Sequence, residues 1–170
     1  TAAMLANIGH LVKDPSPQVR RECAIALHEF RESGDPSETH HIGGKARLWA
    51  QLALQHDGKD RWYLEALGIG AGSDWDACLN AAFALLMDSR TPQISDEVAD
   101  DIIWRSRSSQ TPKLLADGIE VGRTSNENLP RTMRAFDFLS GPEKDEALFS
   151  LAFGYDGKGD QERANFVNSE

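Results

Sequence analysis

Apolar residues recur along this chain at intervals of three and four, the spacing of one face of an α-helix. One early stretch places Val19, Cys23, Ala26, Leu27 and Phe30 on a single stripe. Alternating β-branched runs joined by a hairpin turn, the signature of paired strands, do not occur. The pattern therefore predicts an all-α fold of about ten helices. Their expected ranges are 2–12, 17–31, 45–56, 60–70, 74–88, 95–106, 111–122, 128–139, 142–153 and a fragment near 160–167.

Most of these helices begin at a short polar side chain that can cap the first turn, followed by proline or an acidic residue. The predicted starts are Ser16-Pro17, Ser73-Asp74, Ser95-Asp96-Glu97, Thr111-Pro112, Asn128-Leu129-Pro130 and Ser140-Gly141-Pro142-Glu143. Most linkers are short, which predicts that consecutive helices lie antiparallel. The segment 33–44 is longer, polar and rich in Pro and Gly, and we predict a mobile loop there.

An internal echo indicates a repeat architecture. Residues 52–59 (LALQHDGK) return as residues 151–158 (LAFGYDGK), with five of the eight positions identical. Helix pairs that cannot bury their own faces stack to build a continuous core. We therefore expect one HEAT/ARM-like domain over residues 1–170, an α-solenoid of about five stacked antiparallel helix pairs. The residues expected in its core are Ala26, Leu27, Leu67, Leu85, Phe136 and Leu151.

The segment 11–27 (LVKDPSPQVRRECAIAL) resembles a HEAT repeat, with an Asp at the turn between helices followed by Val-Arg and small residues. In HEAT repeats the Asp and an Arg six residues later typically form a ladder of ion pairs. The resemblance implies that Asp14 and Arg20 make such a pair. Tyr63 and Glu162 stand at the corresponding positions after Asp57 and Asp156, so we expect no ladder beyond the first repeat.

A second resemblance covers residues 10–160. The stretches 55–69 (QHDGKDRWYLEALGI), 103–108 (IWRSRS) and 131–138 (RTMRAFDF) are similar to PVC-type haem-binding proteins, also described as putative membrane-bound dehydrogenases. In that family a sugar-dehydrogenase-like β-propeller precedes helical repeats, and a cytochrome c domain with a CxxCH motif follows them. The resemblance implies an extracytoplasmic setting and a redox-linked parent protein. It carries over neither the propeller's active site nor the haem, so we expect no bound cofactor.

The charge balance argues against nucleic acid as a partner, because 27 acidic residues outnumber 18 basic ones and the formal net charge is −9. A local basic patch of Arg105, Arg107 and Lys113, which could still bind phosphate groups, remains an alternative.

The longest clean apolar run, residues 81–87, is too short for a membrane span, so we expect no membrane insertion. The chain begins at Thr1 and stops at Glu170 inside helical patterns, which suggests an internal fragment of a longer protein.

The two cysteines, Cys23 and Cys78, lie within apolar patterns. Two buried thiols are the favoured interpretation and a disulfide is the alternative.

The glycine-rich stretch 68–73 mimics a dinucleotide-binding loop, but a helix rather than a strand precedes it, which favours the end of a helix and a turn. His40 and His41 are adjacent in the expected loop, where a solvated loop is favoured over a metal site.

Stretches that mimic catalytic or calcium sites also have simpler explanations. The stretch that begins at Asp156-Gly157-Lys158 resembles a calcium loop, but Lys158 stands at the third position, where an oxygen ligand is needed. Gln161 replaces the turn glycine and Val167 stands at the twelfth, ligating position, so an ordinary turn is favoured. No histidine is marked as a base beside a nucleophile. The aromatic residues Trp49, Trp62, Tyr63, Trp75 and Trp104 are at helical spacing, which favours places in the core between stacked helix pairs. The alternative is a surface cluster of Arg61, Trp62 and Tyr63, because adjacent helical residues point about 100° apart and such residues dominate protein-interaction hot spots.

We therefore predict a non-catalytic helical-repeat scaffold that binds neighbouring domains of its parent chain or another protein. One alternative is a segment that positions a propeller and a cytochrome c domain within an electron-transfer or dehydrogenase assembly. The other is an enzyme built on helical repeats, which a cluster of buried histidine and carboxylate groups in a cleft would favour.

Overall fold

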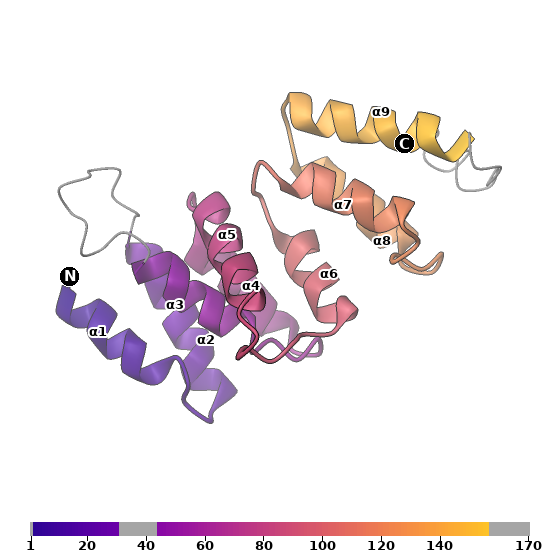
Figure 1. The fold of residues 1–170 in the computed structure, drawn as a ribbon. Helices are drawn as coiled ribbons and strands as arrows, with labels where there is room; N and C mark the ends of the chain where they lie inside the picture. The colour runs from indigo at the N-terminus through magenta and orange to yellow at the C-terminus, as the bar shows by residue number, and fades with distance from the viewer. Residues whose placement is uncertain (1, 31–43, 157–170) are drawn as a thin grey trace. The chain divides into compact units, whose positions relative to one another are not determined.

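The computed structural model describes residues 2–30 and 44–156, and every regular element within those ranges is helical (Figure 1). In chain order the elements are α1 (Ala2–Leu11), α2 (Pro17–Ala26), the 3-10 turn η1 (Leu27–Glu29), α3 (Gly44–Ala53), α4 (Arg61–Ala71), α5 (Trp75–Leu86), α6 (Asp96–Arg105), α7 (Thr111–Glu120), α8 (Leu129–Ala135), η3 (Phe136–Phe138) and α9 (Pro142–Asp156). The all-α prediction is confirmed for these residues. The expected loop at 33–43 and the fragment near 160–167 lie outside them.

Side-chain caps form at the starts of α4 and α6; the cap at Ser95 was predicted, and the cap at Asp60 was not. Asp60 accepts a hydrogen bond from the Tyr63 amide at 3.1 Å and caps α4. Ser95 accepts from the Val98 amide at 3.4 Å and caps α6. Such bonds satisfy amide groups that the first helical turn leaves without a partner. The capping prediction was wrong for Ser16, Asp74 and Asn128, which precede α2, α5 and α8 without a side-chain capping bond. At the starts of α2, α7 and α8 the local signal is instead proline in the first turn.

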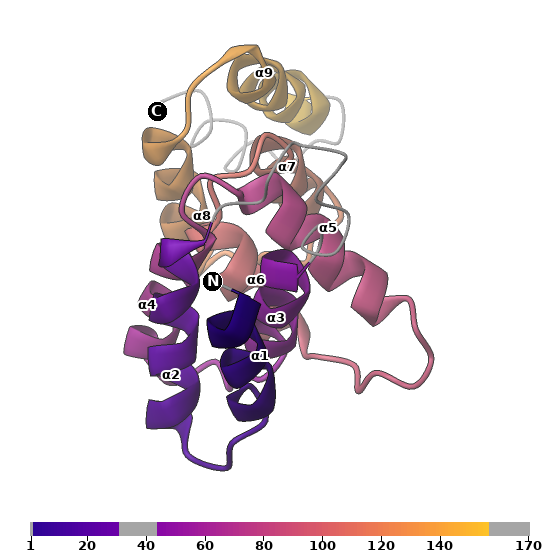
Figure 2. The same ribbon diagram turned by 90° about the vertical axis from the view of Figure 1, so that its left-hand side faces the viewer.

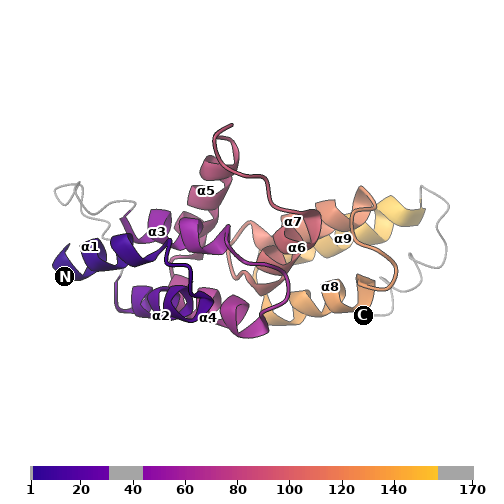
Figure 3. The same cartoon turned by 90° about the horizontal axis from the view of Figure 1, so that it is seen from below.

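The chain divides into two compact units, Thr1–Ser108 and Ser109–Glu170. In the first unit, helices pack on the helix two places along the chain: α1 on α3, α3 on α5, and α2 on α4. Figure 3 shows α2 and α4 side by side beneath α1 and α3, and Figure 2 shows the same two pairs from the N-terminal side. The first unit thus has two layers of helices, one of which contains the α2–α4 pair.

The α2–α4 contact is unusually close because α4 carries glycine in the middle of the helix. A Cβ atom built on Gly70 would lie only 2.1 Å from the backbone oxygen of Ala24 in α2. At Gly68 an added Cβ would instead meet the guanidinium group of Arg105, 2.3 Å away. Only Gly72, with φ of 58°, ends the helix. Our interpretation of the whole glycine-rich stretch as a helix end was therefore wrong for Gly68 and Gly70, which allow close packing.

Long polar side chains bind carbonyl groups at the ends of neighbouring helices. Gln55 donates to the carbonyl of Val12 at 2.8 Å, just beyond α1. The Tyr63 hydroxyl donates to the Leu52 carbonyl near the end of α3 at 3.0 Å, and the same carbonyl also accepts from the Gln55 amide. Helix ends leave several carbonyls without an intrahelical partner, and burying them unpaired is unfavourable. These cross-helix bonds therefore fix where one helix ends against the next.

Four of the six predicted core residues are buried: Leu27, Leu67, Phe136 and Leu151. Ala26 and Leu85 are only half-buried, so those two predictions were wrong. Ala26 is the last residue of α2, and the chain tightens into η1 directly after it, which shifts the buried face to Leu27. Leu85 lies in the last turn of α5, beyond the stretch of Trp75–Ala82 that the helix buries.

The cysteine prediction is confirmed, since Cys23 and Cys78 are both free thiols and both buried. Burial raises the pKa of the Cys23 thiol, and the carboxylates of Asp14 and Glu22 raise it further. A thiol held in its protonated form behaves as a small apolar side chain.

None of the helices in the described ranges has the length and apolar content needed to cross a membrane.

In the second unit, α7 packs along α9 and α8 continues directly into η3. The apolar side of α7 buries Leu115, Ala116 and Ile119. On α9, Ala147 and Leu151 are buried, whereas Phe149 and Phe153 are exposed with ring centroids 4.2 Å apart. Helix α9 therefore has apolar residues both on its packed side and on its outer side.

Candidate functional site

The structure separates the three residues of the predicted interaction cluster. Arg61 and Trp62 are at the start of α4 with their side chains in solvent, and Trp62 is 72% exposed. Tyr63 is only 2% exposed, and its pKa is raised by burial. Successive helical residues point about 100° apart, so Trp62 and Tyr63 cannot share one face. Tyr63 is therefore a core residue, and its inclusion in a surface cluster was wrong.

The predicted HEAT-type pair does not form as an ion pair. Arg20 donates to the main-chain carbonyl of Asp14 at 2.6 Å and to that of Pro15 at 3.1 Å. The Asp14 carboxylate instead accepts from the Ser16 amide at 2.8 Å. In the described ranges, no Asp14–Arg20 contact falls within salt-bridge distance. The arginine does reach the predicted turn, but it caps backbone carbonyls there and lies over the Tyr63 ring at 5.9 Å.

Trp62 lies at one end of a shallow groove between α2 and α4, which we call the Trp62 groove. Its volume is about 440 Å³, and it is lined by Arg21, Ile25, Trp62, Glu65, Ala66 and Ile69. Ile25 is 36% exposed and Ile69 is 45% exposed. On α4 the lining positions follow the helical spacing of a single outer face. A helix that only has to fold places its apolar residues towards the core and polar residues towards solvent. An apolar stripe on the solvent-facing side of α4 is the opposite arrangement.

Two contacts hold the walls of the Trp62 groove together. The backbone approach at Gly70 sets the separation of α2 and α4. A ring nitrogen of His28 in η1 lies 3.0 Å from the carbonyl oxygen of Ile69 and ties the end of α2 to the end of α4. The groove is therefore built on packed helices rather than on loops, which favours a preformed binding surface.

The charges around the Trp62 groove are mainly positive. One oxygen of the Glu65 carboxylate accepts from Arg105 Nε at 3.0 Å, and the other lies 3.9 Å from Arg61 Nε. Arg21 makes no ion pair with any described residue. Two guanidinium groups thus contact the one carboxylate that lines the groove, and a third, that of Arg21, lines the groove without an ion pair to a described residue. The chain as a whole has a formal net charge of −9.

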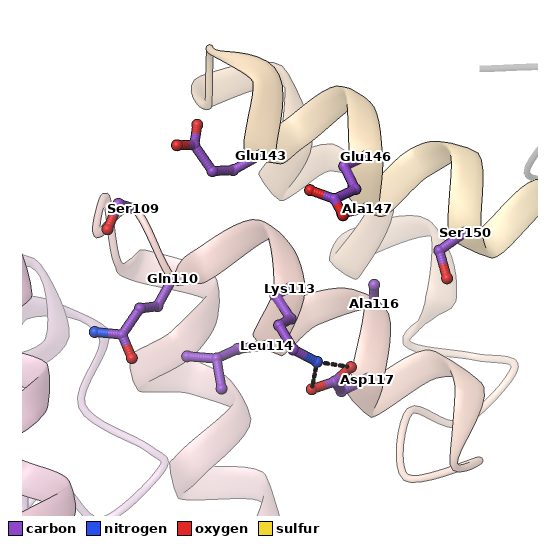
Figure 4. Close-up of a pocket in the computed structure, with 10 residues that line it drawn as sticks. All are labelled: Ser109, Gln110, Lys113, Leu114, Ala116, Asp117, Glu143, Glu146, Ala147 and Ser150. Atoms are coloured by element: carbon purple, nitrogen blue, oxygen red, sulfur yellow. Dashed lines mark hydrogen bonds and ion pairs between the residues drawn. The ribbon is translucent and has the colours of Figure 1, made fainter.

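The second unit has a larger hollow between α7 and α9 (Figure 4). It has a volume of about 510 Å³ and is lined by Ser109, Gln110, Lys113, Leu114, Ala116, Asp117, Glu143, Glu146, Ala147 and Ser150. Lys113 Nζ lies 2.8 Å from both oxygens of Asp117, and this pairing raises the pKa of Lys113. Because Lys113 is paired with Asp117 of the same helix, it does not neutralise the opposite wall. That wall, formed by α9, presents the carboxylates of Glu143 and Glu146. Such a hollow is unsuited to an anion.

Two buried polar pairs were not predicted from the sequence. Lys45 Nζ lies 2.6 Å from an Asp74 carboxylate oxygen and donates to the Ala71 carbonyl at 3.2 Å. His56 Nε2 lies 3.2 Å from an Asp101 carboxylate oxygen. The partners are 29 and 45 positions apart, so no local pattern signals either pair.

The His56–Asp101 pair has the chemical makeup of a base and its orienting carboxylate, but its surroundings favour a structural role. The His56 side chain is 1% exposed, and its ring stacks on Tyr63 with centroids 6.1 Å apart. Neither residue lines the Trp62 groove or the hollow between α7 and α9. A catalytic base must reach a substrate proton, and here the imidazole is enclosed.

Among the described residues, no group of three or more His, Cys, Asp or Glu is arranged to hold a metal ion. His40 and His41 lie outside those residues. The alternative basic patch is not a cluster of available cations. Arg105 pairs with Glu65, Lys113 pairs with Asp117, and burial lowers the pKa of Arg107.

Comparison with protein-family models, curated proteins and solved structures found no significant match. The resemblances to HEAT repeats and to PVC-type haem-binding proteins therefore stay predictions from the sequence.

Proposed function

We propose that this chain is a helical-repeat scaffold whose role is to bind another protein, and that the Trp62 groove is the binding surface. One observation carries the proposal. A tryptophan that is 72% exposed lines a groove with Ile25 and Ile69. Arg21 belongs to the same lining, and the exposed Arg61, directly before Trp62, lies 3.9 Å from the Glu65 carboxylate at the rim. Single exposed apolar residues are ordinary, but a contiguous group centred on tryptophan and flanked by arginine has the composition of an interface hot spot.

The packing within the first unit supports the repeat part of this proposal. Helices contact the helix two places along the chain, on both layers. In stacked repeats, the first helix of one repeat packs on the first helix of the next, and the second helix on the second. Solenoids use the resulting rows of helices as binding faces. We accordingly propose an α-solenoid of HEAT-like pairs, with α2 and α4 in its binding row.

The binding proposal is tested with random peptides displayed on phage and selected on the immobilised 170-residue chain. Selected peptides should lose affinity when Trp62 is replaced by alanine, by about 30-fold or more if Trp62 is a hot spot. Phe138→Ala is the matched control, because Phe138 is also an exposed aromatic residue at 61% and does not line the groove. Peptides that bind both variants equally, or no binders at all, would refute the proposed surface.

The resemblance of three segments to PVC-type haem-binding proteins supports a second proposal. In it, the scaffold positions a propeller and a cytochrome c domain within an extracytoplasmic electron-transfer or dehydrogenase assembly. Two observations test this. The flanking reading frame should encode a propeller on one side and a CxxCH motif on the other. The isolated chain, with neither part, should develop no stoichiometric Soret band when mixed with haem, and a band would contradict the assignment of haem to a flanking domain.

A further inference from the structure

The Trp62 groove carries a charge pattern that narrows the class of partner, on the premise that it is the binding surface proposed above. Arg21 is free of ion pairs among the described residues, and Arg61 is 81% exposed with only the 3.9 Å contact to Glu65. The single carboxylate in the groove is already bound by Arg105. An arriving anion would therefore meet two arginines that need not break a strong internal contact first.

Other acidic groups nearby do not cancel this charge within the groove. Asp60, directly before Arg61, uses its carboxylate to cap α4 through the Tyr63 amide. Glu22 is exposed on α2 but does not line the groove. The local positive charge contrasts with the rest of the chain, whose formal net charge is −9. Complementary charge at a rim steers association and fixes register, while the apolar centre supplies affinity.

The spacing of the lining residues indicates the shape of the partner. Trp62, Ala66 and Ile69 span seven positions on α4, about 10 Å along the helix axis. An amphipathic helix that places apolar residues at i, i+4 and i+7 covers the same distance in two turns. Two neighbouring helices with apolar residues facing outwards form a trough into which such a helix can pack.

We propose that the Trp62 groove binds an acidic amphipathic helix of a partner protein. Two turns of that helix place bulky apolar side chains against Trp62, Ile25 and Ile69. Aspartate or glutamate side chains at its edge pair with Arg21 and Arg61. Nucleic acid is a poor alternative, because phosphate binding needs many clustered cations and the centre of this groove is apolar.

The test uses the peptides that the display selection yields and asks what charge they carry. Peptides that depend on Trp62 should be enriched in Asp and Glu and should show apolar spacing of a helix. One such peptide is then synthesised with a fluorescent label, together with a version in which every Asp and Glu is replaced by Asn and Gln. Anisotropy titrations against the full chain measure both affinities.

The decisive variant reverses the two rim charges, Arg21→Glu with Arg61→Glu. The acidic peptide should bind this variant about tenfold or more weakly, and added salt should narrow the difference. The matched control is Lys13→Glu with Arg47→Glu, which makes the same change in net charge at exposed sites of the first unit outside the groove. Its affinity should change by less than about threefold. Circular dichroism checks that both double variants remain folded.

The outcomes separate this inference from the proposal on which it rests. If Trp62-dependent peptides are neutral or basic, or bind the reversed variant as tightly as the parent, the acidic partner is refuted and the binding surface stands. If no peptide depends on Trp62, both fail. If the chain instead forms a dimer that Trp62→Ala dissolves in sedimentation, the occupant is a second copy and the acidic helix is refuted.

Discussion

The backbone contact at Gly70 makes the sharpest stability prediction. In Gly70→Ala the new Cβ would lie 2.1 Å from the Ala24 carbonyl oxygen and 3.6 Å from Cδ1 of Trp49. Carbon–oxygen contacts under 3.0 Å essentially do not occur, so α2 must move away from α4 by about 1 Å. Trp49 is fully buried beside this contact, which leaves little room for a local adjustment.

The magnitude follows from two opposing effects. Overpacking of a closely packed contact costs about 1–3 kcal/mol and sometimes more. Alanine in the middle of a helix gains about 0.8–1 kcal/mol over glycine. Because the clash is with backbone rather than with a flexible side chain, we place the cost at the upper end of its range. The expected net loss is about 2 kcal/mol in the free energy of unfolding of the first unit.

Gly68→Ala is the matched control on the same helix. The three atoms nearest to its new Cβ all belong to the guanidinium group of Arg105, the far end of a flexible side chain. Moving Arg105 weakens its ion pair with partly exposed Glu65, worth about 0.2–1 kcal/mol, and the gain in helix propensity offsets this. Gly68→Ala should therefore unfold at nearly the parent temperature.

Urea and thermal unfolding, followed by circular dichroism, measure both variants. A loss of 2 kcal/mol corresponds to roughly 8–16 °C in the midpoint temperature of a unit of 60–100 residues. An unchanged slope of the free energy of unfolding against urea concentration would show that the variants expose the same amount of surface on unfolding as the parent. If Gly70→Ala proves as stable as Gly68→Ala, α2 and α4 do not approach as closely as described, and the shape of the Trp62 groove has to be revised with them.

The other predictions concern buried contacts of the first unit. Leu67→Ala removes a fully buried side chain and should lower the free energy of unfolding by about 2–5 kcal/mol in the same assay, whereas an unchanged midpoint would contradict its place in the core. Lys45→Met should destabilise by about 1–3 kcal/mol because it leaves the Asp74 carboxylate unpaired, and adding Asp74→Asn should recover part of the loss in a double-mutant cycle. Burial raises the pKa of Tyr63, so as the pH rises the unfolded chain loses the phenolic proton before the folded chain does. The stabilisation from this group should be fully present below pH about 10 and should fall as the pH rises above it. Tyr63→Phe should reduce this alkaline loss of stability, measured as the free energy of unfolding against pH.

The helices were predictable because their determinants are local. Ser95 caps α6 and Asp60 caps α4 through residues three positions away, and proline falls in the first turn of α2, α7 and α8. The ends were less exact, since α2 and α8 both tighten into 3-10 turns that an apolar stripe does not distinguish from helix. The core prediction for Ala26 was wrong for that reason.

The candidate site could be predicted only in part. The composition of Arg61-Trp62-Tyr63 drew attention to the right helix, but helical geometry turns Tyr63 inwards. The wall that α2 contributes, with Arg21 and Ile25, depends on which residues of two distant segments come together. That register is set by Gly70 against Ala24, a contact 46 positions apart in the chain. Glycines at positions 68 and 70, within an otherwise clear apolar stripe, were the signal of close packing that the sequence did offer.

The unequal exposure of the four tryptophans gives the molecule an internal optical reporter. Trp49 and Trp75 are buried and in contact, with ring centroids 5.4 Å apart, and Trp104 is half-buried. Only Trp62 is largely open to solvent. Iodide in the buffer should therefore quench mainly the red-shifted part of the fluorescence, which comes from the groove. Whatever occupies the groove should protect that emission, without any label on either molecule.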